Sequence, residues 1–156
     1  MTQGIRRRGR ELALKVLYSL QDREGDVESL LGDFWVNFRF SDDILGEPAE
    51  DSLPEVTPEV RRFTDGLVLG VAKNLETIDR VIGEFSTNWA LERMARVDLS
   101  LLRLAAFELL FCPDVPASVV INEAIEIGKR YGTKETSAFV NGILDQISRN
   151  YRQPAP

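Results

Sequence analysis

The sequence predicts an all-α protein of about seven helices. Three observations lead to this fold class. Apolar residues recur at helical spacing through nearly all of the 156 residues. Helix start and stop signals separate the periodic segments. No segment shows the strict alternation of apolar and polar residues that is typical of a half-buried strand. A chain of this length with 44% apolar residues can form one packed domain, which we expect over residues 1–150.

The first helix is predicted over residues 6–21. Four apolar residues there follow the i, i+3, i+4, i+7 rule for one buried face: Ala13, Val16, Leu17 and Leu20. Arg6, Arg10 and Lys15 lie outside that stripe. We therefore expect these three side chains to face solvent or a phosphate backbone.

A weaker helix over residues 26–36 is followed by an acidic segment. Residues 37–56 hold six acids interspersed with Gly46, Pro48 and Pro54. This composition favours a solvated loop, inserted between helices, over a packed element. An alternative role for its acidity is to keep other anions away from the surface.

The third helix has the clearest start signal in the chain. Thr57 can cap it, Pro58 suits its first position, and Glu59 complements the helix dipole. We expect this helix to end near Lys73, a fourth to cover residues 74–85, and a short helix to follow at 89–94. The apolar residues expected to be buried are Val60, Phe63, Leu67, Val71, Leu75, Ile78, Val81, Ile82 and Phe85.

Residues 97–111 are apolar on nearly every face and predict the central helix of a bundle. This segment is too short to span a membrane. Arg103 and Glu108 interrupt it, and we expect both at its exposed edge. Pro113 and Pro116 end it, because proline lacks the backbone donor that a helix needs.

Two further helices are predicted over residues 117–131 and 133–149. Gly132 can adopt the left-handed conformation that ends one helix, and Thr133 can cap the next. Asn122 and Asn141 are expected to fix the packing of this pair by hydrogen bonds. Residues 151–156 should form a frayed tail.

Composition argues against catalysis. The chain has no histidine and one cysteine, Cys112, so the commonest general base is absent and no zinc-binding spacing occurs. It also lacks a glycine-rich phosphate loop and a nucleophile elbow. We expect no enzyme, no cofactor and no metal site. The single cysteine and the lack of a signal peptide or membrane span predict a cytoplasmic protein.

Positive charge is concentrated at one end of an acidic chain. The first 20 residues hold five Lys and Arg against one acid, whereas the net charge of the whole chain is −6. A basic amino-terminal segment of this kind suggests binding of a polyanion, with nucleic acid as the first candidate. The alternative is a solvated basic end without a ligand.

Three blocks of the sequence resemble the NusB family of bacterial transcription antitermination factors. The first is Arg6-Arg7-Arg8-Gly9-Arg10-Glu11-Leu12-Ala13-Leu14-Lys15-Val16-Leu17-Tyr18. The second covers residues 97–109. The third comprises Val115-Pro116, residues 120–129, Tyr131-Gly132, Ser137 and residues 139–145. The acidic 37–56 segment departs from the family by its length.

This resemblance implies two small helical bundles packed across each other. It also implies binding to the boxA element of ribosomal RNA leader transcripts as a heterodimer with NusE, a ribosomal protein. That complex would contact RNA polymerase and other Nus factors indirectly and suppress premature termination, and the free protein could be a homodimer. Two alternatives stay open: a helical adaptor that acts only through protein contacts, and a stand-alone relative of the RNA-binding domain of rRNA methyltransferases.

The resemblance also assigns candidate RNA-binding residues. Arg6, Arg7, Arg8 and Arg10 match the arginine-rich motif of the family, and Lys15 is a further candidate on the same helix. Guanidinium groups suit this role because they bind phosphate through paired hydrogen bonds and stack on bases.

Outside the basic residues, Tyr18 and Phe139 could stack on bases or pack in the core. The resemblance places Asp98, Glu135 and Thr136 near RNA and the protein partner. For Asp98, the alternative is complementing the dipole at the start of its helix.

Overall fold

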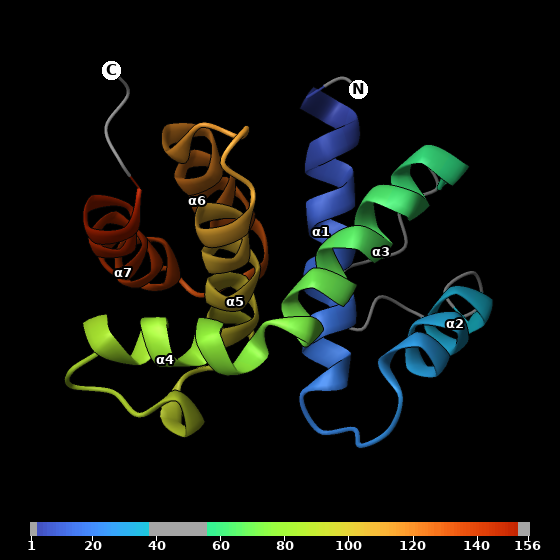
Figure 1. Cartoon of the computed structure of the whole chain (residues 1–156), viewed down its shortest axis with the longest axis horizontal. Coiled ribbons are helices and arrows are strands. Elements are labelled where there is room, and N and C mark those ends of the chain that lie inside the picture. The colour runs from blue at the N-terminus through green and yellow to red at the C-terminus, as the bar shows by residue number, and fades with distance from the viewer. Residues whose placement is uncertain (1–2, 38–55, 153–156) are drawn as a thin grey trace. The chain divides into compact units, whose positions relative to one another are not determined.

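The computed structural model describes residues 3–37 and 56–152, which form seven α-helices and one short 3₁₀ helix, with no strand in these ranges (Figure 1). The helices are α1 (Gln3–Leu20), α2 (Val27–Asn37), α3 (Pro58–Lys73), α4 (Leu75–Phe85), α5 (Arg96–Phe111), α6 (Ala117–Tyr131) and α7 (Thr136–Tyr151), and the 3₁₀ helix η1 is Leu91–Arg93. The predicted all-α class is confirmed. Residues 38–55 of the loop predicted over 37–56 lie outside the described residues, and Asn37 is the last residue of α2.

The chain divides into two compact units, residues 1–72 and residues 73–156. The first unit contains α1, α2 and all but the last residue of α3, and the second contains α4 to α7. The assignment of residues 1–150 to one RNA-binding domain stays a prediction.

In the first unit, α3 crosses α1 at Gly9 (Figure 1). The ring of Phe63 lies against Gly9 so closely that a Cβ atom there would collide with it. Beside this contact, the Thr64 hydroxyl donates a hydrogen bond to the Gly9 carbonyl at 3.2 Å. At the start of α3, the Val60 amide donates to the Thr57 hydroxyl at 3.2 Å, which confirms Thr57 as its cap.

The α2 helix is held on α3 by a tryptophan. The Trp35 indole N–H donates to the Asp65 carboxylate at 2.7 Å. On the ring, the Arg61 guanidinium lies 5.3 Å from the centroid, within the range of a cation–π contact. Asp65 and Arg61 both belong to α3, so the Trp35 side chain links α2 to α3.

The second unit is built around α5, which packs against α4, α6 and α7. Arg103 of α5 is half-buried and forms a two-point ion pair with Asp79 of α4, with both N···O distances 2.9 Å. Glu108 is only 3% exposed. The expectation of an exposed Glu108 is therefore wrong, because a helix surrounded by three others has no wide polar face.

Arg152 caps the C-terminal end of α5. Its guanidinium donates hydrogen bonds to the carbonyls of Glu108, Leu109, Cys112 and Val115 at 2.6–3.1 Å. The last carbonyls of a helix lack partners within it and carry partial negative charge, so the half-buried Arg152 cation suits them.

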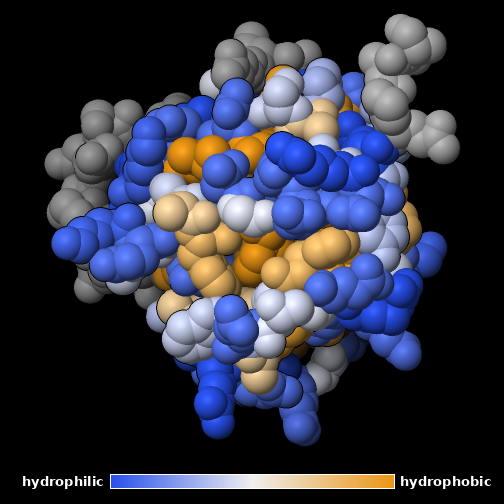
Figure 2. Space-filling view, turned by 90° about the vertical axis from the view of Figure 1, so that its left-hand side faces the viewer, coloured by the Kyte–Doolittle hydropathy of each residue, from blue (hydrophilic) through white to orange (hydrophobic). Residues whose placement is uncertain are grey.

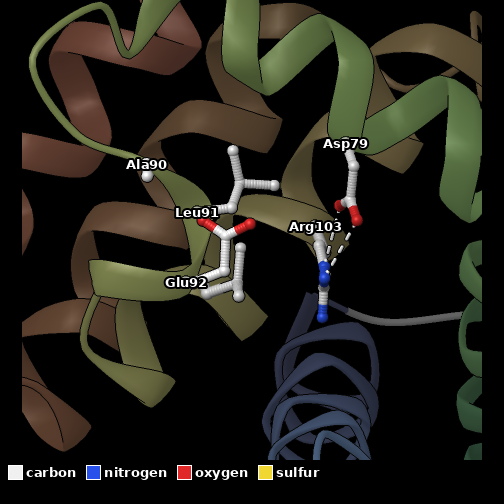
Figure 3. A pocket seen from close by; sticks show the side chains of 6 residues that line it. Asp79, Ala90, Leu91, Glu92 and Arg103 are labelled. Carbon is white, nitrogen blue, oxygen red and sulfur yellow. Dashed lines mark hydrogen bonds and ion pairs between the residues drawn. The ribbon is translucent and has the colours of Figure 1, made fainter.

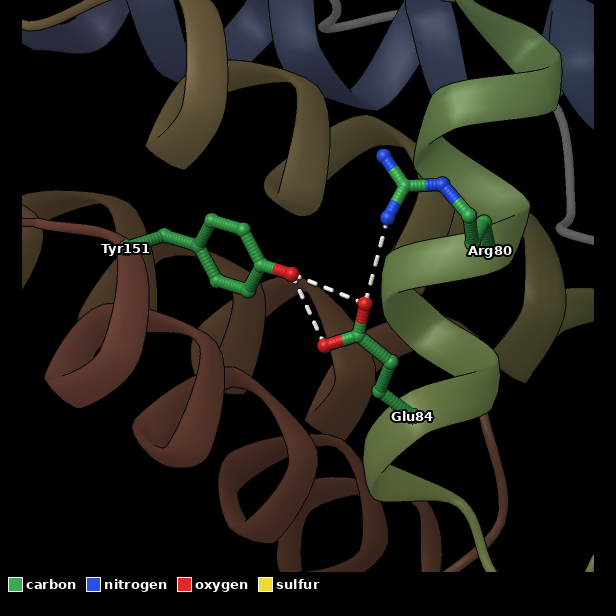
Figure 4. A network of polar contacts seen from close by, with 3 residues as sticks. All are labelled: Arg80, Glu84 and Tyr151. Carbon is green, nitrogen blue, oxygen red and sulfur yellow. Dashed lines mark hydrogen bonds and ion pairs between the residues drawn. The ribbon is translucent and has the colours of Figure 1, made fainter.

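Next to it, the Tyr151 hydroxyl donates to both Glu84 carboxylate oxygens at 2.8 Å, and Glu84 also pairs with Arg80 (Figure 4). The predicted frayed tail is wrong for Tyr151 and Arg152, while residues 153–156 lie outside the described residues.

The turn between α6 and α7 differs from the prediction. Gly132 is extended (φ −98°, ψ −168°), not left-handed, and α7 begins at Thr136 with Glu135 in the cap position. Glycine is needed at 132 for space: a Cβ atom there would collide with the Thr136 side chain. Thr136 is only four residues further along the chain, so local packing within the turn, and not backbone handedness, requires the glycine.

Several side chains also lie on the surface against expectation. Leu75 is exposed at the first position of α4, ahead of its buried face, and Phe63 and Phe85 are half-buried. Asn122 and Asn141 are exposed, so they do not fix the packing of α6 on α7. One face of the molecule shows hydrophobic surface between hydrophilic residues (Figure 2). In the second unit, the large apolar residues that are exposed are Leu75, Trp89, Phe111, Val119 and Tyr151.

Candidate nucleic-acid interface

The first turns of α1 present the arginine cluster. The helix begins at Gln3, three residues before its predicted start, so all four arginines lie within it. Arg6 is exposed, and Arg7 and Arg8 are half-buried. The side chains of these residues therefore extend from a regular helix and not from an irregular end.

Arg8 has unused hydrogen-bond donors. Its Nε and Nη1 atoms are buried and have no hydrogen-bond partner among the described residues. Buried donors on a charged group are costly to leave unpaired, so each such group calls for an explanation. An anionic ligand would supply the missing acceptors.

Arg10 and Lys15 occupy a different environment. Each is 2% exposed, because α1 is buried continuously from Gly9 to Leu17. The Arg10 guanidinium lies 5.8 Å from the centroid of the Phe63 ring, so its chain covers the crossing with α3. The expectation that Arg10 and Lys15 face solvent is wrong, since the core encloses more of α1 than its apolar stripe indicates. Their contact with RNA stays a prediction.

Tyr18 lies near the other end of α1. It is half-buried and makes a polar or ring contact with the rest of the chain. Twelve residues separate it from Arg6, which is about 18 Å along a helix. Arg6 and Tyr18 could therefore contact RNA only at separate nucleotides, and the role of Tyr18 in stacking stays a prediction.

In the second unit, the structure brings Asp98 and Thr136 together. The Thr136 hydroxyl donates to the Asp98 carboxylate at 2.7 Å and accepts from the Thr133 amide at 3.0 Å. Thr136 is 1% exposed, and its side chain lies close to both Gly128 and Gly132. Asp98 at the start of α5 thus holds the α6–α7 turn through Thr136, a contact that local sequence patterns do not predict.

The other two predicted residues of this unit lie nearby in the sequence. Glu135 is exposed, and one of its carboxylate oxygens accepts a hydrogen bond from the Thr133 hydroxyl at 3.1 Å. Phe139, one turn into α7, is half-buried. Both positions leave part of the side chain accessible, and their contact with RNA or a partner stays a prediction.

Sequence reasoning missed a second basic segment, around the end of α6. Lys129, Arg130 and Lys134 are all exposed. The signal was present, since three of six consecutive residues are basic. It was passed over because basic residues are common in the last turn of a helix, where they complement its dipole.

The second unit also contains an open cavity of about 490 Å³ (Figure 3). Its lining residues are Asp79, Ala90, Leu91, Glu92, Leu99 and Arg103. Asp79 and Arg103 neutralise each other in the ion pair drawn in Figure 3, which leaves the Glu92 carboxylate as the remaining charge. This arrangement offers no nucleophile paired with a base.

Two other kinds of site are absent from the described residues. No group of acidic, cysteine or histidine side chains there could hold a metal ion. No described helix is both long and apolar enough to cross a membrane.

The fold and the basic first turns of α1 define an all-helical protein with a candidate nucleic-acid interface. The model of the NusB family matches residues 7–149. A transcription antitermination protein NusB from Syntrophotalea carbinolica is 66% identical over 97% of both chains, and one from Geotalea daltonii is 49% identical over 92% of this chain and 93% of its own. The chain belongs to the NusB family.

Solved structures support the same fold. NusB from T. maritima is 34% identical, with a TM-score of 0.75 over 95% of this chain and 93% of its own. A chain of a complex of NusB and NusE with double-stranded RNA has a TM-score of 0.77 over 96% of this chain and 100% of its own. At 21% identity, the latter shows similarity of fold alone.

Proposed function

We propose that this chain is a transcription antitermination factor that binds boxA RNA together with NusE. The name of its 66% identical relative supports this role, as does the complex with NusE and RNA in which a similar fold occurs. In the chain itself, the proposal is carried by the environments of Arg6 and Arg8. Arg6 is exposed, and Arg8 has two buried donors without an acceptor among the described residues.

The chemistry of these two residues suits a phosphate backbone. A guanidinium group can donate two parallel hydrogen bonds to one phosphate, and it keeps its charge at every physiological pH. The amino-terminal end of α1 adds the positive end of the helix dipole. Arg6 and Arg8 therefore attract the RNA backbone and position it, independently of the base sequence.

Sequence preference has to come from other groups. Phosphate contacts position a nucleic acid, whereas base contacts specify it. Tyr18 and Phe139 are half-buried aromatic residues that can present a ring edge or face to an unstacked base. NusE supplies the remaining contacts in this proposal.

The remaining parts of the proposal follow from this role. The protein acts without catalysis and without a cofactor, in the cytoplasm. It contacts RNA polymerase and other Nus factors indirectly, through RNA and NusE. In the absence of both ligands it could associate with itself.

A titration of labelled boxA RNA at several salt concentrations tests the proposal. Replacing both Arg6 and Arg8 with alanine should weaken binding and lower the log–log salt slope by about 1.4, since each phosphate contact to single-stranded RNA contributes about 0.7. The melting temperature should not fall, because neither side chain has a polar partner to lose among the described residues.

Arg23→Ala is the matched control. Arg23 is exposed just beyond the other end of α1, and the helix from Arg8 to its last residue, Leu20, is about 18 Å long. It should leave the slope unchanged. Equal affinity and slope for the double variant and the unsubstituted protein would exclude Arg6 and Arg8 as phosphate ligands.

A further inference from the structure

The run of arginines at the start of α1 contains a glycine that contacts α3. Gly9 lies between Arg8 and Arg10, and three atoms of the Phe63 ring lie where a side chain at Gly9 would begin. Glycine is a poor helix former, and this contact accounts for its presence because a larger residue would collide with the ring. Gly4, also in α1, has nothing within 4 Å of its Cβ position. Of the two glycines, Gly9 is therefore the one that lets α3 approach α1.

This contact fixes the rotation of α1 about its own axis. Successive residues of a helix are about 100° apart, so Arg8 and Arg10 flank Gly9 on opposite sides. A rotation of α1 by one position would bring one of these long side chains against the Phe63 ring in place of Gly9. The ring leaves no room even for a Cβ atom there, so the rotation is set by the contact.

The same ring also engages one of the arginines. The Arg10 guanidinium lies 5.8 Å from the centroid of the Phe63 ring, and Arg10 is 2% exposed. Arg6 lies about one turn earlier on the same side of the helix and is exposed. Arg8, on the opposite flank of Gly9, has the two buried donors without an acceptor among the described residues. The rotation of α1 therefore decides in which directions Arg6 and Arg8 leave the helix.

The neighbouring Thr64 adds a weaker link to Gly9. Its buried hydroxyl lies 3.2 Å from the Gly9 carbonyl oxygen and 2.9 Å from the Val60 carbonyl oxygen of its own helix. A hydroxyl has one proton to donate, and the shorter distance favours Val60. The Phe63 ring therefore contributes more to the contact with Gly9 than the Thr64 hydroxyl does.

We propose that Phe63 is a positioning residue for RNA binding: by packing on Gly9 it sets the rotation of α1 and thereby directs Arg6 and Arg8 toward the phosphate backbone. Paired hydrogen bonds from a guanidinium group to a phosphate need a defined approach. A helix whose rotation is already set also loses less conformational entropy on binding. The inference rests on the proposed function, because Arg6 and Arg8 are its phosphate ligands. Phe63 acts through them and not by touching RNA.

Phe63→Leu tests this role in a titration with fluorescently labelled boxA RNA. Leucine stays apolar but removes the flat ring from Gly9, and we expect binding to weaken about three- to tenfold. The substitution is then repeated in the variant that has alanine in place of Arg6 and Arg8. Effects of residues that act through one another are not additive, so the further loss there should be less than about twofold. The same fold-loss in both backgrounds would overturn the proposal.

Gly9→Ala disturbs the same contact from the side of α1, and it keeps the proposal testable even where Phe63→Leu fails to fold. The added methyl group displaces the ring, so binding should weaken, again only while Arg6 and Arg8 are present. Gly4→Ala is the matched control, because it adds the same methyl group at an open position of the same helix. It should leave binding unchanged. Equal affinities of the two alanine variants would contradict a positioning role.

A second control separates positioning from a general loss of stability. Trp35→Phe removes the hydrogen bond of 2.7 Å from α2 to Asp65, which loosens the first unit at a contact that does not include Gly9. Measured well below the melting temperature of every variant, its affinity for boxA RNA should equal that of the unsubstituted protein. Binding as weak as that of Phe63→Leu would show that loosening of the unit is responsible, and the positioning role would be wrong. Failure of the unsubstituted protein to bind boxA RNA, alone or with NusE, would instead overturn the proposed function.

Discussion

Arginine residues near the two ends of the described chain have opposite roles. Arg6 and Arg8 in α1 make no polar contact with the described residues, and two donors of Arg8 are buried without an acceptor. Arg152, the last described residue, donates to four backbone carbonyls, two in the last turn of α5 and two in the segment that follows it. The same guanidinium group is thus available for a ligand in one place and fully engaged in structure in the other.

The difference teaches that charge alone does not identify a binding residue. What decides is whether the fold provides acceptors for the donors of the side chain. Arg10 shows the same difference within the cluster, because it lies only two residues after Arg8 and is buried over the Phe63 ring. The cluster looks like one motif in the sequence, yet it contains both arginines engaged in packing and arginines without a polar partner among the described residues.

The largest expected effect in this comparison is that of Arg152→Ala. It leaves four carbonyls, in the last turn of α5 and just after it, without their cation, and hydrogen bonds to a charged group each contribute about 1.5–3 kcal/mol. Because the four share one side chain, we expect the free energy of unfolding to fall by about 2–4 kcal/mol in urea denaturation. Arg6→Ala, the comparison at the other end, should change it by less than about 0.5 kcal/mol. Equal stability of the two variants would contradict the distinction drawn here.

Gly9→Ala tests whether the glycine within the arginine cluster serves packing. The added methyl group collides with the Phe63 ring at the crossing of α1 and α3. Overpacking costs about 1–3 kcal/mol, and the better helix propensity of alanine offsets about 1 kcal/mol of it. We expect a net loss of up to about 2 kcal/mol in thermal or urea unfolding. An increase in stability would mean that the ring moves aside without cost. Gly4→Ala, at an open position on the same helix, is the control and should not be destabilising.

Thr136→Val tests the link between α5 and the α6–α7 turn. Valine has nearly the same shape but cannot donate to Asp98, so a part-buried carboxylate loses a partner. We expect a loss of about 1–2 kcal/mol. Thr136→Ser keeps the hydroxyl and should retain most of the hydrogen-bond contribution. If both variants lose the same stability, the methyl group and not the hydrogen bond is what matters.

The smallest effect concerns Tyr151, beside Arg152. Its hydrogen bond to Glu84 raises the pKa of Tyr151 above its ordinary value of 10.0, with burial and the negative charge of Glu84 acting in the same direction. The neutral phenol is therefore favoured in the folded state, so its stabilising contribution is complete below pH 10 and is lost as the pH rises through the folded pKa. Compared with Tyr151→Phe, the unsubstituted protein should lose stability more steeply above pH 10. Parallel stability curves for the two proteins would show that this hydrogen bond contributes nothing.

Much of the fold could be predicted because its signals are local. The caps and first residues of α3 follow from Thr57 and Pro58, and the extent of α5 follows from a continuous apolar run. The buried faces of α1, α3 and α4 repeat at helical spacing. Errors arose where a residue's environment depends on a distant segment, as for Glu108 and Lys15, and where packing within a turn was not foreseen, as for Gly132. Local spacing carries no information about how many neighbours enclose a helix.

The candidate site also has a part that could be predicted from the sequence and a part that could not. The concentration of arginines in α1 and the resemblance to the NusB family were visible in the sequence, and family membership is confirmed. The basic residues at the end of α6, Lys129, Arg130 and Lys134, were visible in the sequence but were not recognised as a second basic segment. The hydrogen bond between Asp98 and Thr136 joins residues 38 positions apart and was not predictable from either residue.

By itself, the sequence determined the all-helical class, the positions of most helices and the charge at the start of α1, because periodicity, caps and composition act over a few neighbouring residues. Only the tertiary structure decided which charged side chains remain available. Arg152 and Arg10 are engaged because carbonyls and an aromatic ring from other helices meet them. Arg6 and Arg8 meet no such partner among the described residues, and for that reason they are the ones proposed to bind RNA.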